Sequence, residues 1–308
     1  MRRPSARALA VPQAFLVVFC WATSWVLIKI GLRDIPPLPF AGLRYLLAAL
    51  CLTPFVLASA GARASVRCLT LSRWWSLVAL GLVMAVTQGA QFVALGRLPA
   101  ASLGLILGCT PVLVALLGIA LLGEVPRRSQ WAGMATYLAG AALYFSPWAP
   151  PGAGAAAVSV AVLGVAAVQL VANALTTVQG RYVNCGGDGH PAVVTLVTMG
   201  LCGGVLLAVG VPAQGLPAPT PAGWLITLEL AVVNTALAWA LWNHALRTLP
   251  AVRAGLINNT MMIHVAGLGW LFLGERLGVR EVLGLAVALA GVVAVQVGRA
   301  SATRRDHG

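Results

Sequence analysis

The sequence has very little charge for its length. Of its 308 residues only 9% are charged, whereas 60% are hydrophobic. A soluble domain is usually about 25% charged, so a surface that faces water on all sides cannot be built from these residues. This shortage excludes soluble enzymes and disordered tails. It predicts a polytopic membrane protein whose outer surface faces lipid.

Patterns that support catalysis or metal binding are also missing. The chain has seven acidic residues, no H-E-x-x-H motif, no aspartate pair and no cluster of cysteine with histidine. Its six cysteines show no C-x2-C spacing of the kind that binds zinc. A membrane enzyme needs a nucleophile, metal ligands or paired acids. We therefore expect no enzyme activity, no cofactor and no metal.

The basic residues are in excess, but they are scattered. The net charge is +13, and the arginines stand singly or in twos and threes between long apolar runs. This arrangement is not that of a nucleic-acid binder, and we expect no nucleic-acid partner. Arginines near a bilayer surface interact with anionic lipid headgroups, so the lipid bilayer itself accounts for the excess.

The apolar runs divide the chain into ten predicted spans of roughly 20 residues, the length that crosses a bilayer as a helix. They are Val11–Leu32, Phe40–Ser59, Trp75–Leu95, Ala101–Leu122, Trp131–Trp148, Ala155–Val178, Ala192–Val211, Trp224–Leu246, Val252–Leu273 and Val282–Val297.

The arginines predict how these spans are oriented. With the N-terminus in the cytoplasm, fourteen arginines fall on the cytoplasmic side. The outer side receives four, Arg33, Arg97, Arg276 and Arg280. Cytoplasmic loops are enriched in Lys and Arg, so both termini are expected in the cytoplasm. Nineteen arginines against the single Lys29 fit a GC-rich genome, and we predict a bacterial inner membrane.

Sliding the chain against itself by about 150 residues reveals an internal repeat. The matching pairs are Leu98–Ala100 with Leu249–Ala251, Gly104–Ile106 with Gly255–Ile257, Leu122–Glu124 with Leu273–Glu275, Gly133 with Gly284, and Leu138–Gly140 with Leu289–Gly291. The sequence thus predicts two five-helix repeats, residues 1–148 and 149–308. Because five is odd, the second repeat is inverted, an architecture typical of secondary transporters.

Several of these runs resemble EamA-type members of the drug/metabolite transporter superfamily. The runs are Phe19–Gly31, Pro39–Ala49, Pro111–Glu124 and Gly267–Glu275. The resemblance implies a ten-helix fold that moves metabolites, often amino acids or related compounds, commonly outward. The chain departs from the family pattern at Met262, where the second repeat often has a proline matching Pro111.

Polar and tryptophan side chains within the spans are the candidates for a substrate cavity, because polar groups in hydrocarbon usually face a cavity or another helix. They are Trp21, Trp25, Gln88, Gln91, Gln169, Asn173, Trp239, Trp242, Asn258 and Asn259. The alternative is that these amides bond across helix interfaces without meeting a substrate. The tryptophans can stack on a flat or apolar group of a substrate.

Four titratable residues are candidates for a gate or for coupling. Lys29, Arg44 and Glu229 lie near the predicted outer ends of their spans, and Glu229 can pair with either cation when the outer side closes. The alternative for the two cations is that they snorkel to the interface. His264 lies near the middle of its span and can titrate at physiological pH, although a packing role is the alternative.

These features together predict a secondary transporter that exports small zwitterionic or neutral metabolites by alternating access. The alternatives are a flippase for a lipid-linked sugar or other amphipathic cargo, and a passive accessory subunit. The pairs Gly104-x3-Gly108 and Gly200-x3-Gly204 permit close approach of helices. We assign them to packing inside one bundle and expect a monomer, with a dimer interface as the alternative.

Overall fold

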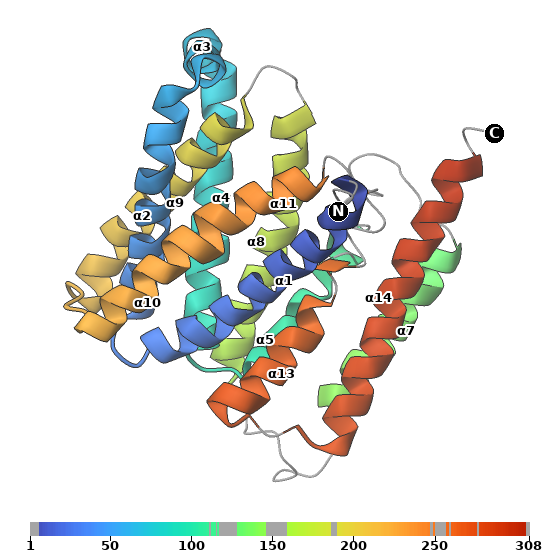
Figure 1. The fold of residues 1–308 in the computed structure, drawn as a ribbon. Helices are drawn as coiled ribbons and strands as arrows, with labels where there is room; N and C mark the ends of the chain where they lie inside the picture. The colour runs from blue at the N-terminus through green and yellow to red at the C-terminus, as the bar shows by residue number, and fades with distance from the viewer. Residues whose placement is uncertain are drawn as a thin grey trace, which may run out of the picture. The chain divides into compact units, whose positions relative to one another are not determined.

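The structure is a computed structural model, and it describes most of the chain. The described residues are 6–110, 112–114, 116, 128–145, 159–185, 190–246, 249, 257–258, 260–275 and 277–305. They are largely helical and include no strand, which confirms the predicted all-α class. Figure 1 shows the helices α1 (Ala6–Gly31), α2 (Pro37–Ala58), α3 (Ala60–Cys68), α4 (Leu71–Leu95), α5 (Ala100–Leu107), α7 (Arg128–Phe145), α8 (Val160–Cys185), α9 (Pro191–Gln214), α10 (Pro221–Ala231), α11 (Ala238–Leu246), α13 (Met261–Leu273) and α14 (Val279–Arg305).

Each of the ten predicted spans overlaps a described helix, but some bounds differ. The sixth span was placed too early, because α8 runs from Val160 to Cys185 rather than over Ala155–Val178. The eighth span consists of α10, a π-helical segment η1 (Val232–Leu237) and α11, which follow one another without a break. Among the described residues, the five helices α1, α2, α4, α8 and α9 are long and apolar enough to cross a membrane. The chain also forms the short helix α3, which was not predicted.

The chain forms two compact units, and each unit contains helices from both repeats. Unit 1 comprises residues 1–26, 98–163 and 239–308, and unit 2 comprises residues 27–97 and 164–238. The compact units are therefore not the sequence repeats 1–148 and 149–308, whose bounds stay a prediction. Contacts between repeats occur inside each unit.

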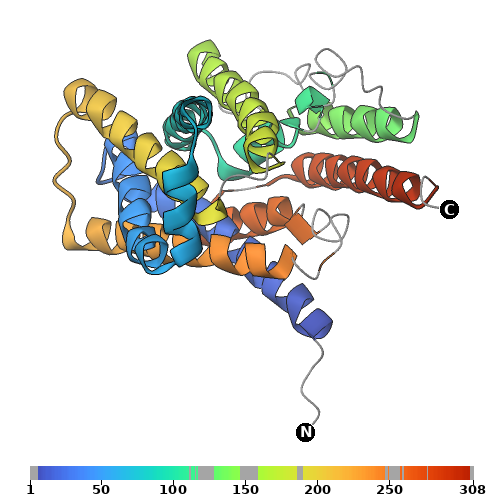
Figure 2. The ribbon, with the colours of Figure 1, turned by 90° about the horizontal axis from the view of Figure 1, so that it is seen from above.

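In unit 1, α7 packs along α14, its equivalent in the second repeat, as Figures 1 and 2 both show. A Cβ added at Gly284 would lie 2.8 Å from the carbonyl oxygen of Gly140. One added at Gly291 would lie 2.6 Å from the carbonyl oxygen of Gly133. The lower-numbered glycine of one helix thus meets the higher-numbered glycine of the other, so the two helices are antiparallel.

The same arrangement joins α2 to α9 in unit 2. A Cβ at Gly203 would lie 2.5 Å from the backbone nitrogen of Leu46, and one at Gly210 would lie 2.8 Å from the Pro39 side chain. Numbers again rise along one helix as they fall along the other. Equivalent helices that pack antiparallel in both units are what inverted repeats require, which confirms the predicted inversion.

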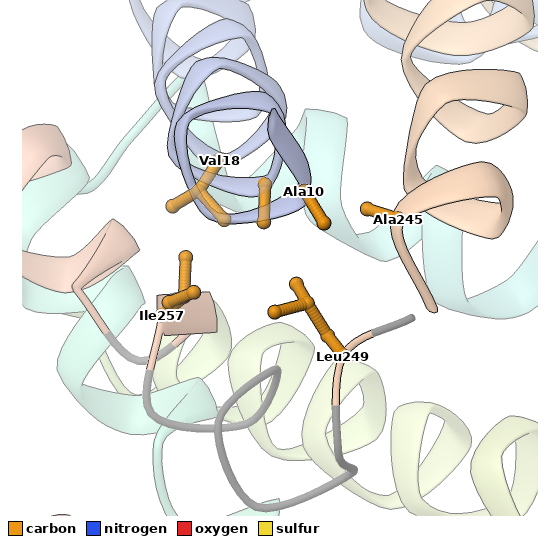
Figure 3. Packing of buried hydrophobic residues seen from close by; sticks show 6 residues of the cluster. Ala10, Val18, Ala245, Leu249 and Ile257 are labelled. Carbon is orange, nitrogen blue, oxygen red and sulfur yellow. The ribbon is translucent and has the colours of Figure 1, made fainter. Parts of the chain in front are cut away.

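A small apolar core holds α1 to the second repeat in unit 1. Ala10, Ala14 and Val18 of α1 pack with Ala245 of α11 and with Leu249 and Ile257, as Figure 3 shows. The side chains of α1 in this core recur at intervals of four residues, the spacing that places them on one face of a helix. This face fixes α1 beside the tryptophans of α11.

The contact between α2 and α9 generates a prediction with a matched control. The predicted pair Gly200-x3-Gly204 is not the close contact, because a Cβ at Gly204 would meet nothing within 4 Å. We expect Gly203→Ala to lower the stability of the purified protein by about 1–3 kcal/mol, because the methyl group meets the backbone of α2. Gly204→Ala is expected to have no such effect. Melting temperatures in detergent check both, and equal melting of the two variants would contradict this packing.

Candidate functional site

A polar stripe lies where α4 of the first repeat meets α8 of the second, both in unit 2. The hydroxyl oxygens of Thr87 and Thr176 are 3.1 Å apart and share a hydrogen bond. Gln91 lies one turn beyond Thr87 on α4, and Asn173 and Gln169 lie three and seven residues before Thr176 on α8. This spacing places each set on one face of its helix. The stripe is therefore a polar contact between the two repeats.

Gln169 is the deepest member of this stripe. Its side chain is only 1% exposed, and its buried Oε1 atom has no hydrogen-bond partner among the described residues. Leaving a buried amide oxygen without a partner costs about 1–3 kcal/mol. Gln88, Gln91 and Asn173 are half-buried. An amide kept at this cost is expected to have a use other than stability.

Arg44 lies at a second contact between repeats in unit 2, and it is buried rather than snorkelling. Its side chain is 7% exposed, and its Nε donates a hydrogen bond of 3.1 Å to the Thr235 hydroxyl of η1. That hydroxyl in turn donates to the Leu230 carbonyl oxygen, 2.8 Å away. The Arg44 Cζ lies 5.3 Å from the centroid of the Tyr45 ring. These contacts hold the guanidinium inside the bundle.

Glu229 of α10 is half-buried, and the next residue, Leu230, accepts a hydrogen bond from the Thr235 hydroxyl that Arg44 also contacts. No ion pair joins the two side chains in the part of the chain that the structure describes. The buried Glu229 Oε2 has no hydrogen-bond partner there. Lys29, also predicted as a gate residue, is half-buried near the end of α1. The predicted gate pairing of Glu229 with Arg44 is thus near in space but not formed.

Three of the predicted tryptophans meet in unit 1. The ring centroid of Trp21 on α1 lies 5.5 Å from that of Trp239 and 5.2 Å from that of Trp242, both in the second repeat. Trp239 keeps 43% of its surface exposed. Trp25 is buried, and a Cβ at Gly104 would lie 3.9 Å from its ring, so it packs on α5. The cluster of Trp21, Trp239 and Trp242 offers an accessible aromatic surface.

His264 and Asn258 belong to unit 1 as well. The His264 ring lies edge-on to Phe19 of α1, with centroids 5.9 Å apart, and its buried Nδ1 has no hydrogen-bond partner among the described residues. Asn258 is half-buried. Asn259 lies outside the described residues. The predicted residues therefore divide between the units, with the glutamines, Asn173 and the charged residues in unit 2 and the tryptophans, Asn258 and His264 in unit 1.

Two carboxylates that cap helices were not predicted from the sequence. The Asp34 carboxylate accepts hydrogen bonds from the Thr220 nitrogen (2.9 Å) and hydroxyl (2.7 Å) at the start of α10. The Glu275 carboxylate accepts from the Ala100 nitrogen at the start of α5, at 2.8 and 3.1 Å. Carboxylates stabilise helix N-termini, and Pro221 marks the start of α10 in the sequence. The proline indicates where α10 starts, but it does not indicate that Asp34 caps this start.

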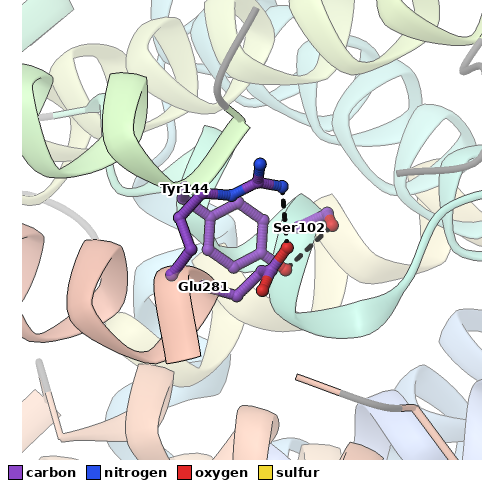
Figure 4. Close-up of polar contacts among 4 residues, drawn as sticks. Ser102, Tyr144 and Glu281 are labelled. Atoms are coloured by element: carbon purple, nitrogen blue, oxygen red, sulfur yellow. Dashed lines mark hydrogen bonds and ion pairs between the residues drawn. The ribbon is translucent and has the colours of Figure 1, made fainter. Parts of the chain in front are cut away.

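A second unpredicted polar group lies beside α5 in unit 1. The hydroxyl oxygens of Ser102 and Tyr144 are 3.1 Å apart, and Arg280 forms an ion pair of 3.0 Å with Glu281, as Figure 4 shows. Tyr137 donates a hydrogen bond to the Leu105 carbonyl oxygen. The hydrogen bonds of Tyr144 and Tyr137 tie α7 to α5, and they satisfy polar groups that would otherwise face lipid.

Comparison with known proteins identifies what the chain is similar to. The profile of the EamA-like transporter family matches residues 8–146 and again residues 156–296. The inner membrane transporter YedA of Escherichia coli strain K12, whose name marks it as uncharacterized, is 25% identical over 296 residues, covering 92% of this chain and 90% of that protein. A "probable amino-acid metabolite efflux pump" of Salmonella typhimurium is 37% identical over 129 residues, covering 41% and 40%. A solved structure titled "Crystal structure of protein" has a TM-score of 0.65 at 19% identity, covering 94% of this chain and 98% of that one, and supports the fold.

The unpartnered amide generates a prediction on stability. We expect Gln169→Leu to raise the stability of the purified protein by about 1 kcal/mol, because leucine fills the same space without a buried unpartnered oxygen. Thr176→Val, which removes the bonded hydroxyl near the same stripe, is the control and is expected to lower it by about 0.5–1.5 kcal/mol. Melting in detergent measures both. A large loss of stability in Gln169→Leu would show that the amide is satisfied in the native protein.

Proposed function

The chain belongs to the EamA-like transporter family, and on that premise we propose that it is a secondary transporter that exports small metabolites. Its cargo is amino acids or related zwitterionic or neutral compounds, and it works by alternating access through a central cavity lined by both repeats. Inverted repeats favour this mechanism, because two similar halves can rock around a site where they meet.

The observation that carries the proposal is the polar stripe of α4 and α8. It places the nearly fully buried Gln169 amide where the two repeats meet in unit 2. Polar side chains within a membrane are costly and usually mark a substrate route. In this proposal Gln88, Gln91, Gln169 and Asn173 hydrogen-bond a passing solute.

The chemistry of the stripe supports uncharged or zwitterionic cargo. Amides and hydroxyls donate and accept hydrogen bonds but carry no net charge, so they do not compensate a multiply charged anion. The name of the Salmonella typhimurium relative agrees with this class and with export.

The location follows from the same premise. YedA is named as an inner membrane transporter, and the distribution of arginines favours a bacterial inner membrane with both termini in the cytoplasm. We propose a monomer, since the glycine contacts of α2 with α9 and of α7 with α14 are used within one chain.

Removal of one amide of the stripe tests the site. We expect Asn173→Ala to lower metabolite export from expressing cells by about fivefold, because one lost hydrogen bond to solute is worth about 1 kcal/mol. Thr136→Ala, at an exposed position on α7, is the control and is expected to export as the wild type does. The measurement compares extracellular metabolites at matched expression. Unchanged export in Asn173→Ala would remove the stripe from the substrate route.

The energy source gives a further prediction. We propose facilitated export or exchange rather than strict proton symport, since no carboxylate lies at the middle of a predicted span and Glu229 is only five residues into its predicted span. In proteoliposomes, the substrate gradient alone is expected to drive flux as fast as it does with an imposed pH gradient. Flux that stops without the pH gradient would contradict this proposal and would point to His264 or Glu229 as the proton carrier.

A further inference from the structure

The Arg44 guanidinium is only partly used by the protein. Its Nε is bonded to Thr235, and neither Nη1 nor Nη2 has a hydrogen-bond partner among the described residues. The guanidinium has five N–H donors in a fixed plane, so four donors of a residue that is only 7% exposed have no protein partner among the described residues. Nη1 and Nη2 are not among the fully buried unpartnered atoms, so a solute can reach them. Buried charges are normally paired, because an unpaired one is costly.

The opposite charge is present but does not fill that gap. The Leu230 carbonyl oxygen, on the residue after Glu229, accepts from the same Thr235 hydroxyl that receives the Arg44 Nε, yet the buried Glu229 Oε2 makes no hydrogen bond within the described residues. A guanidinium and a carboxylate that are neighbours without being paired form a divided site, with a positive and a negative end. A bound solute with one negative and one positive group would pair with both side chains of the divided site.

The two charges lie at similar depth in unit 2. Arg44 is seven residues from the start of α2 and Glu229 eight residues from the start of α10, or about 10–12 Å at 1.5 Å per residue. The two starts are tied together, because the Leu38 nitrogen donates to Gln214 Oε1 at 3.0 Å and Thr220 donates to Asp34. The divided site is therefore within the bundle, not at its surface.

The local backbone keeps the positive end fixed. Thr235 belongs to the π-helical segment η1, where its hydroxyl bonds the carbonyl of the residue five positions earlier. This leaves the Thr235 oxygen free to accept from Arg44 Nε. π-Helical turns are rare and frequently occur at functional sites. The Tyr45 ring under the guanidinium limits its rotation.

We propose that Arg44 and Glu229 bind the two ends of a zwitterionic α-amino acid. The unused Nη1 and Nη2 receive the substrate carboxylate as a planar fork, the geometry that Arg offers to carboxylates, and the Glu229 carboxylate receives the substrate ammonium group. This inference rests on the proposed transport function, for which it names the two residues that hold the charged ends of the cargo. In this site Arg44 and Glu229 do not pair directly as a gate. Each of them pairs with the opposite charge of a bound solute.

The test compares amino acids with analogues that lack one charge. Leucine, threonine and phenylalanine are the probes, each beside its decarboxylated amine and its deaminated acid. Binding is measured by the rise in melting temperature of the purified full chain. We expect at least one amino acid to bind about tenfold or more tightly than both of its analogues, since each lost charged contact is worth at least that factor.

Two variants assign the ends of the site. Arg44→Gln is expected to lose the preference for the amino acid over its amine, and Glu229→Gln the preference over its deaminated acid. Arg44→Lys, which keeps the charge but loses the fork, is expected to weaken amino-acid binding in the same direction. Arg97→Gln, at an exposed position after α4, is the control and leaves all preferences unchanged.

Several results would overturn the inference. The first is that the wild type binds the analogues as tightly as the amino acids, and the second is that it binds no probe. The third is that the variants weaken binding of all compounds alike, as the loss of a gate residue would. The first two need only the wild type, so they decide even where a variant fails to fold. Metabolite export by a wild type that binds no zwitterion would refute this site and leave transport standing, whereas absence of export would refute transport itself.

Discussion

The close antiparallel packing of equivalent helices is the constraint on which the rest of the structure depends. Gly140 and Gly284 bring α7 against α14, and Gly203 brings α9 against α2, at distances that leave no room for a Cβ. Each contact joins one helix to the equivalent helix of the other repeat, so a local two-fold axis relates the two helices. Lipid offers no hydrophobic force to hold helices together, and close van der Waals contact takes its place. Close contacts at glycines therefore hold the two repeats together within each unit.

Such packing decides where polar groups can lie. Two polar contacts lie where the repeats meet, between Thr87 and Thr176 and between Arg44 and Thr235, whereas Ser102 and Tyr144 pair within the first repeat. Polar groups inside a membrane need partners within the protein, because lipid offers none. The polar contacts between repeats suit the proposed transport route, which runs where the two repeats meet.

The sequence predicted the helices, the repeat and its inversion, because apolar length and matched glycines are local or internal signals. It also predicted the polar face of α8, since Gln169, Asn173 and Thr176 repeat with helical spacing. It could not select Gly203 over Gly204, because the partner helix decides which face is in contact. The sequence also could not predict the π-helical η1 or the Glu275 cap on Ala100. Both depend on residues distant in the sequence.

The scaffold is symmetric, but its charges are not. Arg44 lies on α2, whereas α9, the equivalent helix of the second repeat, contains no charged residue. A guanidinium on only one helix of this equivalent pair makes the charge distribution asymmetric. In the proposed alternating access, the symmetric glycine contacts account for opening toward either face, and the one-sided charge accounts for one oriented site rather than two. A carrier needs both, because a fully symmetric pair of charged sites would double the cost of burying charge in the membrane.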